Sequence, residues 1–287
     1  MNVKPNGDCR GSREGSRGVT YEDSNVIEMF GRRIQILDLS DTISNHTSAF
    51  EKNPQSIRYF AHEDTAKMSA DIFGIGSDYW RNGQAWAYEI ATLSTHSGTH
   101  IDAPYHYAPQ SGGSAARTVE QLPLNWLIGD GVVLNMIDAD RKAGIGARDI
   151  EIALDRIDYS LKPRDIVLIR TDASKFFDEP GYDYKHAGLR AEATRFLVER
   201  GVRLIGIDAW GLDRPFDIMI EEAKLGDRHQ LWESHYFGAE QEYCQIEKLA
   251  NLDSLPRSHG FSVLALPVKV ANASAGWSRV VALVPLD

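Results

Sequence analysis

The chain has 287 residues, and its composition, 43% hydrophobic and 25% charged, is that of an ordinary globular protein. The formal net charge is −10 and the sequence has no Lys/Arg-rich run, so we expect small-molecule partners and no nucleic acid. Cys9 and Cys244 lie far apart, and neither a signal-peptide core nor a membrane-length apolar run is present, which favours a cytoplasmic protein with no disulfide framework and no membrane contact.

Residues 1–28 are predicted to form a flexible tail, or an arm that is ordered only against another subunit. The first 25 residues are rich in Gly, Ser, Arg, Asp and Glu, and offer little apolar surface to offset the entropy of fixing them. We expect ordered structure from about Met29. Because no repeat, linker or change of composition divides the remainder, residues 29–287 are expected to form one mixed α/β domain.

The remaining elements are predicted from hydrophobic periodicity. Strands are expected at 33–39, 85–93, 132–137, 166–170, 204–207, 261–270 and 280–284, and helices at 148–154 and 189–200. The run at 166–170 is continuously apolar, as in a strand buried on both faces. Residues 42–84 have an irregular pattern with scattered aromatic residues. They are expected to be either a functional lid or pocket wall, or a surface loop with aromatic anchors.

Three imidazoles and one carboxylate fall within eleven residues, in His-Ser-Gly-Thr-His-Ile-Asp-Ala-Pro-Tyr-His. His96, His100, Asp102 and His106 share even parity, so in an extended backbone their side chains face the same way. The glycine, proline and β-branched residues between them argue against a helix and predict a strand end that runs into a loop. Three of the nine histidines lie here, which favours a metal site over a purely structural polar network. Imidazole with carboxylate suits zinc or manganese, and an open position for water implies hydrolysis.

Further metal ligands must come from other segments, because one loop cannot surround an ion and leave its open face free. His235 and Glu247 are twelve residues apart, a spacing that suits the two sides of a turn. By spacing alone, three other carboxylates are equally plausible: Glu233, Glu240 and Glu242.

Asp208 and Asp213 follow a predicted buried strand, where α/β sheets commonly place ligand contacts. Such a carboxylate can orient a metal-binding histidine through its second ring nitrogen. For Asp213 we favour an ion pair with Arg214 that closes a loop, and for Asp208 both interpretations stay open. The sequence has no Gly-x-Ser-x-Gly, Gly-x-Gly-x-x-Gly or Walker pattern, so serine hydrolase, dinucleotide oxidoreductase and nucleotide triphosphatase functions lack support.

Residues 96–107 resemble the signature His-x-Gly-Thr-His-x-Asp-x-Pro-x-His-Phe of the metal-dependent cyclase/hydrolase family, which includes bacterial kynurenine formamidase, isatin hydrolase and trans-dienelactone hydrolase. Segments 38–40, 165–171, 201–208 and 246–256 are also similar to the family, so the resemblance spans residues 33–284. It implies an α/β, single-domain fold of the swivelling β/β/α type, with a mixed sheet or barrel-like core and flanking helices. It also implies a homo-oligomer, dimer or tetramer, and a kynurenine formamidase-like catalytic domain at 29–287.

Carried over by position, the resemblance implies one or two Zn²⁺ or Mn²⁺ ions and five ligands: His96, His100, Asp102, His235 and Glu247. Asp102 would be able to bridge the two ions. His106 is similar to the family's catalytic histidine, a general base or acid beside the metal-bound water. Tyr107 stands where the family usually has Phe, a departure that touches no ligand.

We therefore predict a metal-dependent hydrolase, an amidase or lactonase, that cleaves an N-formyl, cyclic amide or lactone bond in a small aromatic or cyclic substrate. Aromatic residues from 42–84, notably Trp80, together with Trp210 are expected to hold a flat substrate. Arg214 or Arg279 is expected to pair with a substrate carboxylate. A lyase or cyclase that acts through an enolate and a non-catalytic metal-binding protein are the alternatives.

Overall fold

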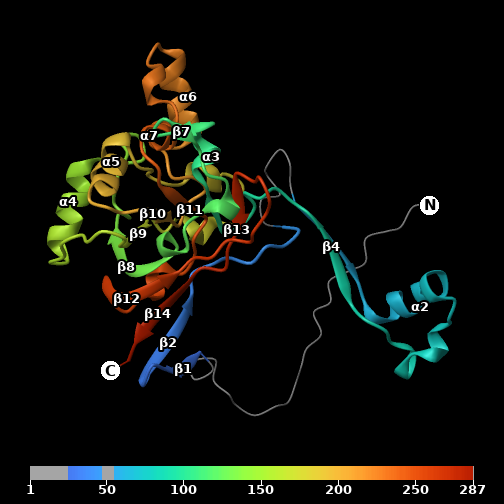
Figure 1. The fold of residues 1–287 in the computed structure, drawn as a ribbon. Helices are drawn as coiled ribbons and strands as arrows, with labels where there is room; N and C mark the ends of the chain where they lie inside the picture. Colours follow the sequence, from blue (N-terminus) through green and yellow to red (C-terminus); the bar gives the residue numbers. More distant parts are fainter. Residues whose placement is uncertain (1–24, 47–54, 287) are drawn as a thin grey trace.

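The computed structural model describes residues 25–46 and 55–286 (Figure 1). The described residues form a ten-stranded mixed sheet. The strand order is β1 (Val26–Met29), β2 (Arg32–Asp38), β14 (Val281–Pro285), β12 (His259–Leu264), β8 (Ile128–Asn135), β9 (Ile166–Arg170), β10 (Leu204–Ile207), β11 (Cys244–Glu247), β5 (His100–Asp102) and β13 (Ala275–Trp277). The α/β class with a mixed sheet and flanking helices is therefore confirmed.

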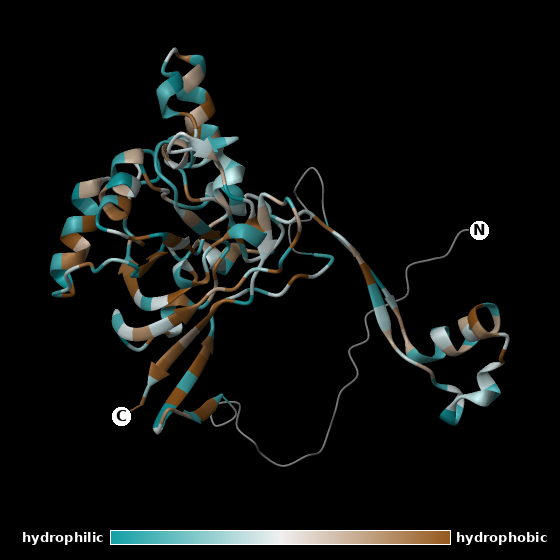
Figure 2. Ribbon diagram, viewed as in Figure 1, coloured by the Kyte–Doolittle hydropathy of each residue, from teal (hydrophilic) through white to brown (hydrophobic). Residues whose placement is uncertain are grey.

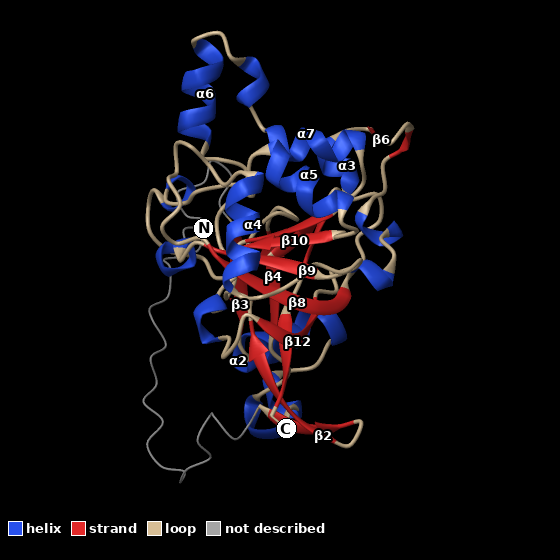
Figure 3. Cartoon of the chain, turned by 90° about the vertical axis from the view of Figure 1, so that its left-hand side faces the viewer, coloured by secondary structure: helices blue, strands red, loops and turns tan. Residues whose placement is uncertain are grey.

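The centre of the sheet is parallel, since β8, β9, β10 and β11 run in one direction. As predicted, β9 is buried on both faces. Val167 and Ile169 pack in a cluster with α4 (Ala147–Arg156) and α5 (Ala191–Glu199), both close to their predicted positions. Figures 1 and 3 show these helices against the β8–β10 part of the sheet, and in Figure 2 they alternate hydrophobic and hydrophilic residues, as helices that bury one face do.

A second apolar cluster lies on the other face of the sheet. It contains Ile166 and Leu168 of β9 together with Val263 of β12 and Val284 of β14. The parallel strands are thereby fixed from both sides, and the loops at their carboxyl ends are free to carry a site. The loop after β10 leads to α6 (Phe216–Lys224) and α7 (Glu233–Glu240), and β11 ends at Glu247.

Residues 42–84 differ from the irregular stretch that the sequence predicted. Here β3 (Ser56–Phe60) pairs antiparallel with β4 (Tyr88–Thr92), and α2 (His62–Phe73) stands at the far end of this ribbon. Figure 1 shows the ribbon and α2, which we call the arm, projecting away from the sheet. The helix is capped by the Asp64 carboxylate, which accepts the Ala61 N–H at 3.0 Å, and it ends at Gly74 in the left-handed conformation.

Other predicted elements are confirmed with shifted bounds. The strand expected at 85–93 exists as β4, but it belongs to the arm, and the one expected at 261–270 ends at Leu264. Besides α2 and β3, the sequence analysis missed seven elements: α6, α7, β11, β13, α3 (Pro104–Tyr107) and the short pair β6 (Gln110–Ser111) and β7 (Ser114–Ala115). Strand β1 begins inside the segment expected to be a tail, and residues 1–24 of that segment lie outside the described residues. No described helix is long and apolar enough to cross a membrane.

Candidate metal centre

The histidine-rich motif is built around β5, an interior strand that pairs antiparallel with both β11 and β13. Alternation along β5 places His100 and Asp102 on one face, as parity predicted. The chain then departs from the predicted loop, because Pro104 at the first helical position begins the single turn α3, which carries His106 back over the site. Gly98 has φ +61°, and a Cβ there would lie 2.6 Å from Ile43, so this turn requires glycine.

Asp102 lies at the middle of the cluster, and its two carboxylate oxygens face different partners. Oδ1 lies 2.8 Å from Nδ1 of His96 and 3.2 Å from Nε2 of His100. Oδ2 lies 3.8 Å from Nε2 of His106 and 3.9 Å from Nε2 of His235. All the motif side chains therefore come together, and the second segment supplies His235 as the resemblance implied.

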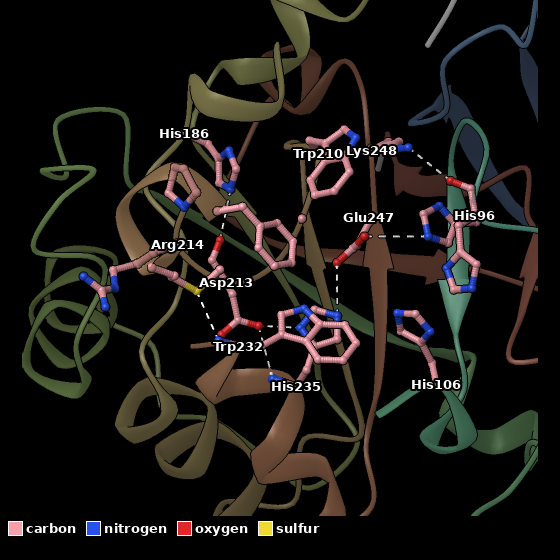
Figure 4. A pocket seen from close by; sticks show the side chains of 15 residues that line it. His96, His106, His186, Trp210, Asp213, Arg214, Trp232, His235, Glu247 and Lys248 are labelled. Carbon is pink, nitrogen blue, oxygen red and sulfur yellow. Dashed lines mark hydrogen bonds and ion pairs between the residues drawn. The ribbon is translucent and has the colours of Figure 1, made fainter. Parts of the chain in front are cut away.

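Glu247, at the end of β11, also reaches both groups of histidines. Its Oε2 lies 3.7 Å from Nε2 of His100, and its Oε1 lies 3.6 Å from Nε2 of His235. Figure 4 shows this carboxylate pointing between the motif and His235. Two sets of ligand atoms are compact enough to share an ion, His96–Asp102–His106 and His100–Asp102–Glu247.

Two atoms of the cluster have charged or polar neighbours but make no hydrogen bond. Nε2 of His100 and Oδ1 of Asp102 are buried and have no hydrogen-bond partner among the described residues. Nδ1 of His100 lies 2.8 Å from the carbonyl of Gly98, so it carries the hydrogen and Nε2 presents a lone pair. A buried carboxylate oxygen beside a buried lone pair is costly unless a cation lies between them. The donor set therefore fits a borderline divalent ion such as zinc or manganese.

The electrostatics agree with this donor set. Burial would raise the pKa of Asp102, but the surrounding histidines outweigh it and hold that pKa well below its usual value. Burial lowers the pKa of His100, and it lowers the pKa of His106 to about 4. Asp102 is thus ionised and the imidazoles of His100 and His106 are neutral at ordinary pH, and an ionised carboxylate and a neutral imidazole are the forms that bind a metal. Burial and the charge of Asp102 raise the pKa of Glu247 well above its usual value.

Asp213 positions His235, which corrects the ion pair with Arg214 that we favoured from the sequence. Its carboxylate makes a close contact with Nδ1 of His235 and accepts the Ser234 N–H at 2.7 Å and the His235 N–H at 3.2 Å. Nδ1 therefore carries the hydrogen, and Nε2 of His235 turns its lone pair toward Asp102 and Glu247.

Asp208, by contrast, is a structural cap. Its carboxylate accepts the N–H groups of Thr171 and Asp172 at 2.7 and 2.9 Å, and so joins the ends of β9 and β10. The three alternative carboxylates are also outside the cluster, because each is paired with an arginine: Glu233 with Arg190, Glu240 with Arg195 and Glu242 with Arg117.

A pocket of about 260 Å³ opens onto the cluster. Its inner end is formed by the ligand candidates, and its walls include Trp210, Phe216 and Trp232. Arg214 also lines it, but its guanidinium is held by Glu222, with one contact of 2.7 Å, and by Gln230 at 2.9 Å.

Two expected substrate-binding residues do not lie in this pocket. Trp80 is not among the described residues that line the pocket. It lies in the arm and donates its indole N–H to Ser69 at 2.9 Å. Arg279 is exposed and pairs with Asp38 at 2.7 Å.

Sequence reasoning missed two residues of the site. Trp232 stacks on His235, with ring centroids 4.1 Å apart and an angle of 17°, although its backbone is left-handed at φ 57°. This conformation is unusual for a bulky residue and is typical of functional sites. Gln245 contacts both Asp102 and Glu247. Its place two residues before Glu247, on the same face of a strand, was the signal that could have found it.

The comparisons agree with this geometry. The family described as "Putative cyclase" matches residues 37–214. Kynurenine formamidase of Maricaulis maris is 31% identical over 218 residues, which cover 76% of this chain and 88% of that protein. Isatin hydrolase A from Labrenzia aggregata bound to benzyl benzoate has a TM-score of 0.61 at 26% identity, covering 88% of this chain and 94% of that one. A potential metal-dependent hydrolase with cyclase activity shares the fold, with a TM-score of 0.59 at 20% identity over 87% of this chain and 98% of that one. The chain therefore belongs to the cyclase family, as a metal-dependent hydrolase similar to kynurenine formamidases and isatin hydrolases.

Proposed function

We propose that this chain uses one or two divalent ions, Zn²⁺ or Mn²⁺, to hydrolyse an amide or lactone bond in a small aromatic or cyclic substrate. The observation that carries the proposal is the pair of buried atoms that make no hydrogen bond, Nε2 of His100 and Oδ1 of Asp102, which lie 3.2 Å apart beside a pocket that His100 lines. The ions would be held by His96, His100, Asp102, His235 and Glu247. The names of its relatives suggest an N-formyl aromatic amide or a cyclic aromatic amide as the substrate class.

A divalent ion bound here would polarise the scissile carbonyl and lower the pKa of a water molecule. His106 is the proposed proton carrier. Because burial lowers its pKa to about 4, its imidazole is neutral at ordinary pH and able to accept a proton. Its ring lies 4.2 Å from that of His96 and 5.5 Å from that of His235, which places it over the proposed metal ligands.

The pocket walls determine the proposed substrate shape. Trp210 and Phe216 meet edge to face at 5.9 Å, and Trp232 lies against His235, so a flat ring would be enclosed by apolar surface next to the cluster. We propose Trp210 and Arg214 as substrate-binding residues. Both terminal nitrogens of Arg214 are hydrogen-bonded within the protein, to Glu222, Gln230 and the Lys142 carbonyl, so we propose that it acts as a fixed part of the pocket wall rather than as a freely moving cation.

We also propose that residues 29–287 act as one catalytic domain of the swivelling β/β/α type in a homo-oligomer. The arm supports this, because it exposes Tyr59, Phe73 and Tyr79 on an element with little other packing. Trp80 is close to a pocket only if the arm lies against a second copy, so its proposed role in substrate binding depends on this assembly. A dimer or tetramer in solution supports this part of the proposal, and a monomer at assay concentrations contradicts it.

The test combines metal analysis with a panel of N-formyl, cyclic imide and lactone substrates. His100→Ala is expected to lose bound metal and turnover together, whereas the exposed His229→Ala serves as a matched control and keeps both. Full turnover by metal-free His100→Ala protein contradicts the proposal. Product formed in H₂¹⁸O must carry the label, because a lyase or cyclase would not add solvent oxygen.

A further inference from the structure

Gln245 lies at the centre of the cluster, on the strand that carries Glu247. The register pairs Gln245 with Asp102 across β11 and β5, and the side chain is fully buried. Its amide nitrogen donates to Oδ2 of Asp102 at 3.0 Å and to Oε1 of Glu247 at 3.1 Å, and it also makes a close contact with Nε2 of His235.

These contacts divide the cluster into two halves. The first half consists of Nδ1 of His96, Nε2 of His100, Oδ1 of Asp102 and Oε2 of Glu247. The second half consists of Oδ2 of Asp102, Oε1 of Glu247 and Nε2 of His235. Each carboxylate thus presents one oxygen to each half.

The two halves differ in how their atoms are satisfied. In the first half, Nε2 of His100 and Oδ1 of Asp102 have no hydrogen-bond partner among the described residues. In the second half, each of the three atoms contacts the Gln245 amide. All three atoms are acceptors. Two are carboxylate oxygens, and Nε2 of His235 carries no hydrogen because Nδ1 donates its hydrogen to Asp213. The two N–H groups of the amide, together with the Leu212 N–H that Oε1 of Glu247 accepts at 2.9 Å, give three donors for these three acceptors, and so meet in the second half the need that a cation would meet in the first.

The hydroxyl of Tyr243, 3.1 Å from Oε1 of Gln245, holds the other end of the amide away from the ligands.

We infer that the Gln245 amide takes the place of a second cation, so that each chain binds one divalent ion, in the first half, where the ligand atoms of His100, Asp102 and Glu247 lie close enough together to share it. This inference rests on the proposed function, because it presupposes a metal site in the cluster. In this arrangement His235 holds Gln245 in place, and the single ion would lie next to the pocket and His106.

The test is the metal stoichiometry of the whole chain. Protein stripped with a chelator is titrated with MnCl₂ in a calorimeter, and the manganese retained after gel filtration is measured by mass spectrometry. We expect one Mn²⁺ per wild-type chain. Gln245→Ala and Gln245→Glu are expected to bind two, since they expose the three acceptors of the second half or add a carboxylate to them. Gln241→Glu, which introduces the same charge four residues earlier, is the control and keeps one ion.

Electron paramagnetic resonance gives a second readout that does not depend on turnover. Manganese-loaded wild-type protein is expected to give the six-line spectrum of an isolated ion, and Gln245→Glu that of a coupled pair. Circular dichroism establishes that each variant is folded before it is titrated.

Three results overturn the inference. Two ions in an active wild-type chain remove it and leave the proposed function in place. A Gln245→Ala chain that binds its single ion more weakly and gains none also removes it, because the amide would then be a ligand. A folded wild-type chain that retains no manganese or zinc removes both proposals.

Discussion

Replacing Asp213 by alanine tests how the site is held together. The Asp213 carboxylate accepts the N–H groups of Ser234 and His235, the second and third residues of α7, because Trp232 at the helix N-cap supplies no side-chain acceptor. The same carboxylate holds Nδ1 of His235. Loss of an N-cap costs about 1 kcal/mol, and loss of a hydrogen bond to a charged group costs about 1.5–3 kcal/mol. With both lost, we expect Asp213→Ala to destabilise the protein by about 2.5–4 kcal/mol.

The assay is urea unfolding of chelator-treated protein, followed by tryptophan fluorescence. Asp213→Asn keeps an oxygen for the Ser234 N–H but loses the charged acceptor for Nδ1 of His235, so about 2 kcal/mol is expected. Destabilisation of Asp213→Ala by less than about 1 kcal/mol would refute the reasoning, since it would mean that these buried donors find other partners. Equal losses for the alanine and asparagine variants would show that the helix cap contributes nothing.

Two further predictions concern residues near the cluster. Burial lowers the pKa of His186 to about 4 from an ordinary value of 6.5, so the unfolded chain takes up its proton first on acidification. About 3 kcal/mol of stability, present above pH 6.5, is therefore lost as the pH falls to 4. The free energy of unfolding should fall less between pH 7 and pH 4.5 in His186→Gln than in wild type. An equal fall in both proteins contradicts this prediction. A Cβ on Gly238 would lie 2.2 Å from the Tyr107 ring. Gly238→Ala should therefore lower Tm, although alanine favours a helix more than glycine does. Adding Tyr107→Leu to the same chain should restore part of the loss in Tm. A raised Tm for Gly238→Ala would show that the ring can move away.

The clustering of the histidine-rich motif was predictable because its parts are local. Three histidines and an aspartate fall within eleven residues, and alternation along β5 accounts for His100 and Asp102 without any knowledge of the fold. His235 and Glu247 needed the family resemblance, since spacing alone left three other carboxylates open. Gln245 and Asp213 depend on strand register and on the packing of α7, which no local pattern contains.

Two of the missed helices, α2 and α7, have a common physical cause. The buried face of α2 consists of Thr65, Ala66 and Ser69, and that of α7 includes Ser234 and Gly238. Small and polar residues form no apolar stripe with a period of 3.6 residues. The hydrophobic periodicity that predicted α4 and α5 is therefore absent from these two helices. In both helices the small faces allow close contacts, with Trp80 at Ser69 and with Tyr107 at Gly238.

The interior position of β5 has a consequence for biogenesis. Its two neighbours, β11 and β13, are synthesised about 140 to 170 residues later, and Glu247 arrives with β11. Contacts of such long sequence separation form late in folding. The side chains that would hold an ion are therefore complete only once β11 has been synthesised and has docked beside β5, and a product that ends before Glu247 lacks one of the proposed ligands.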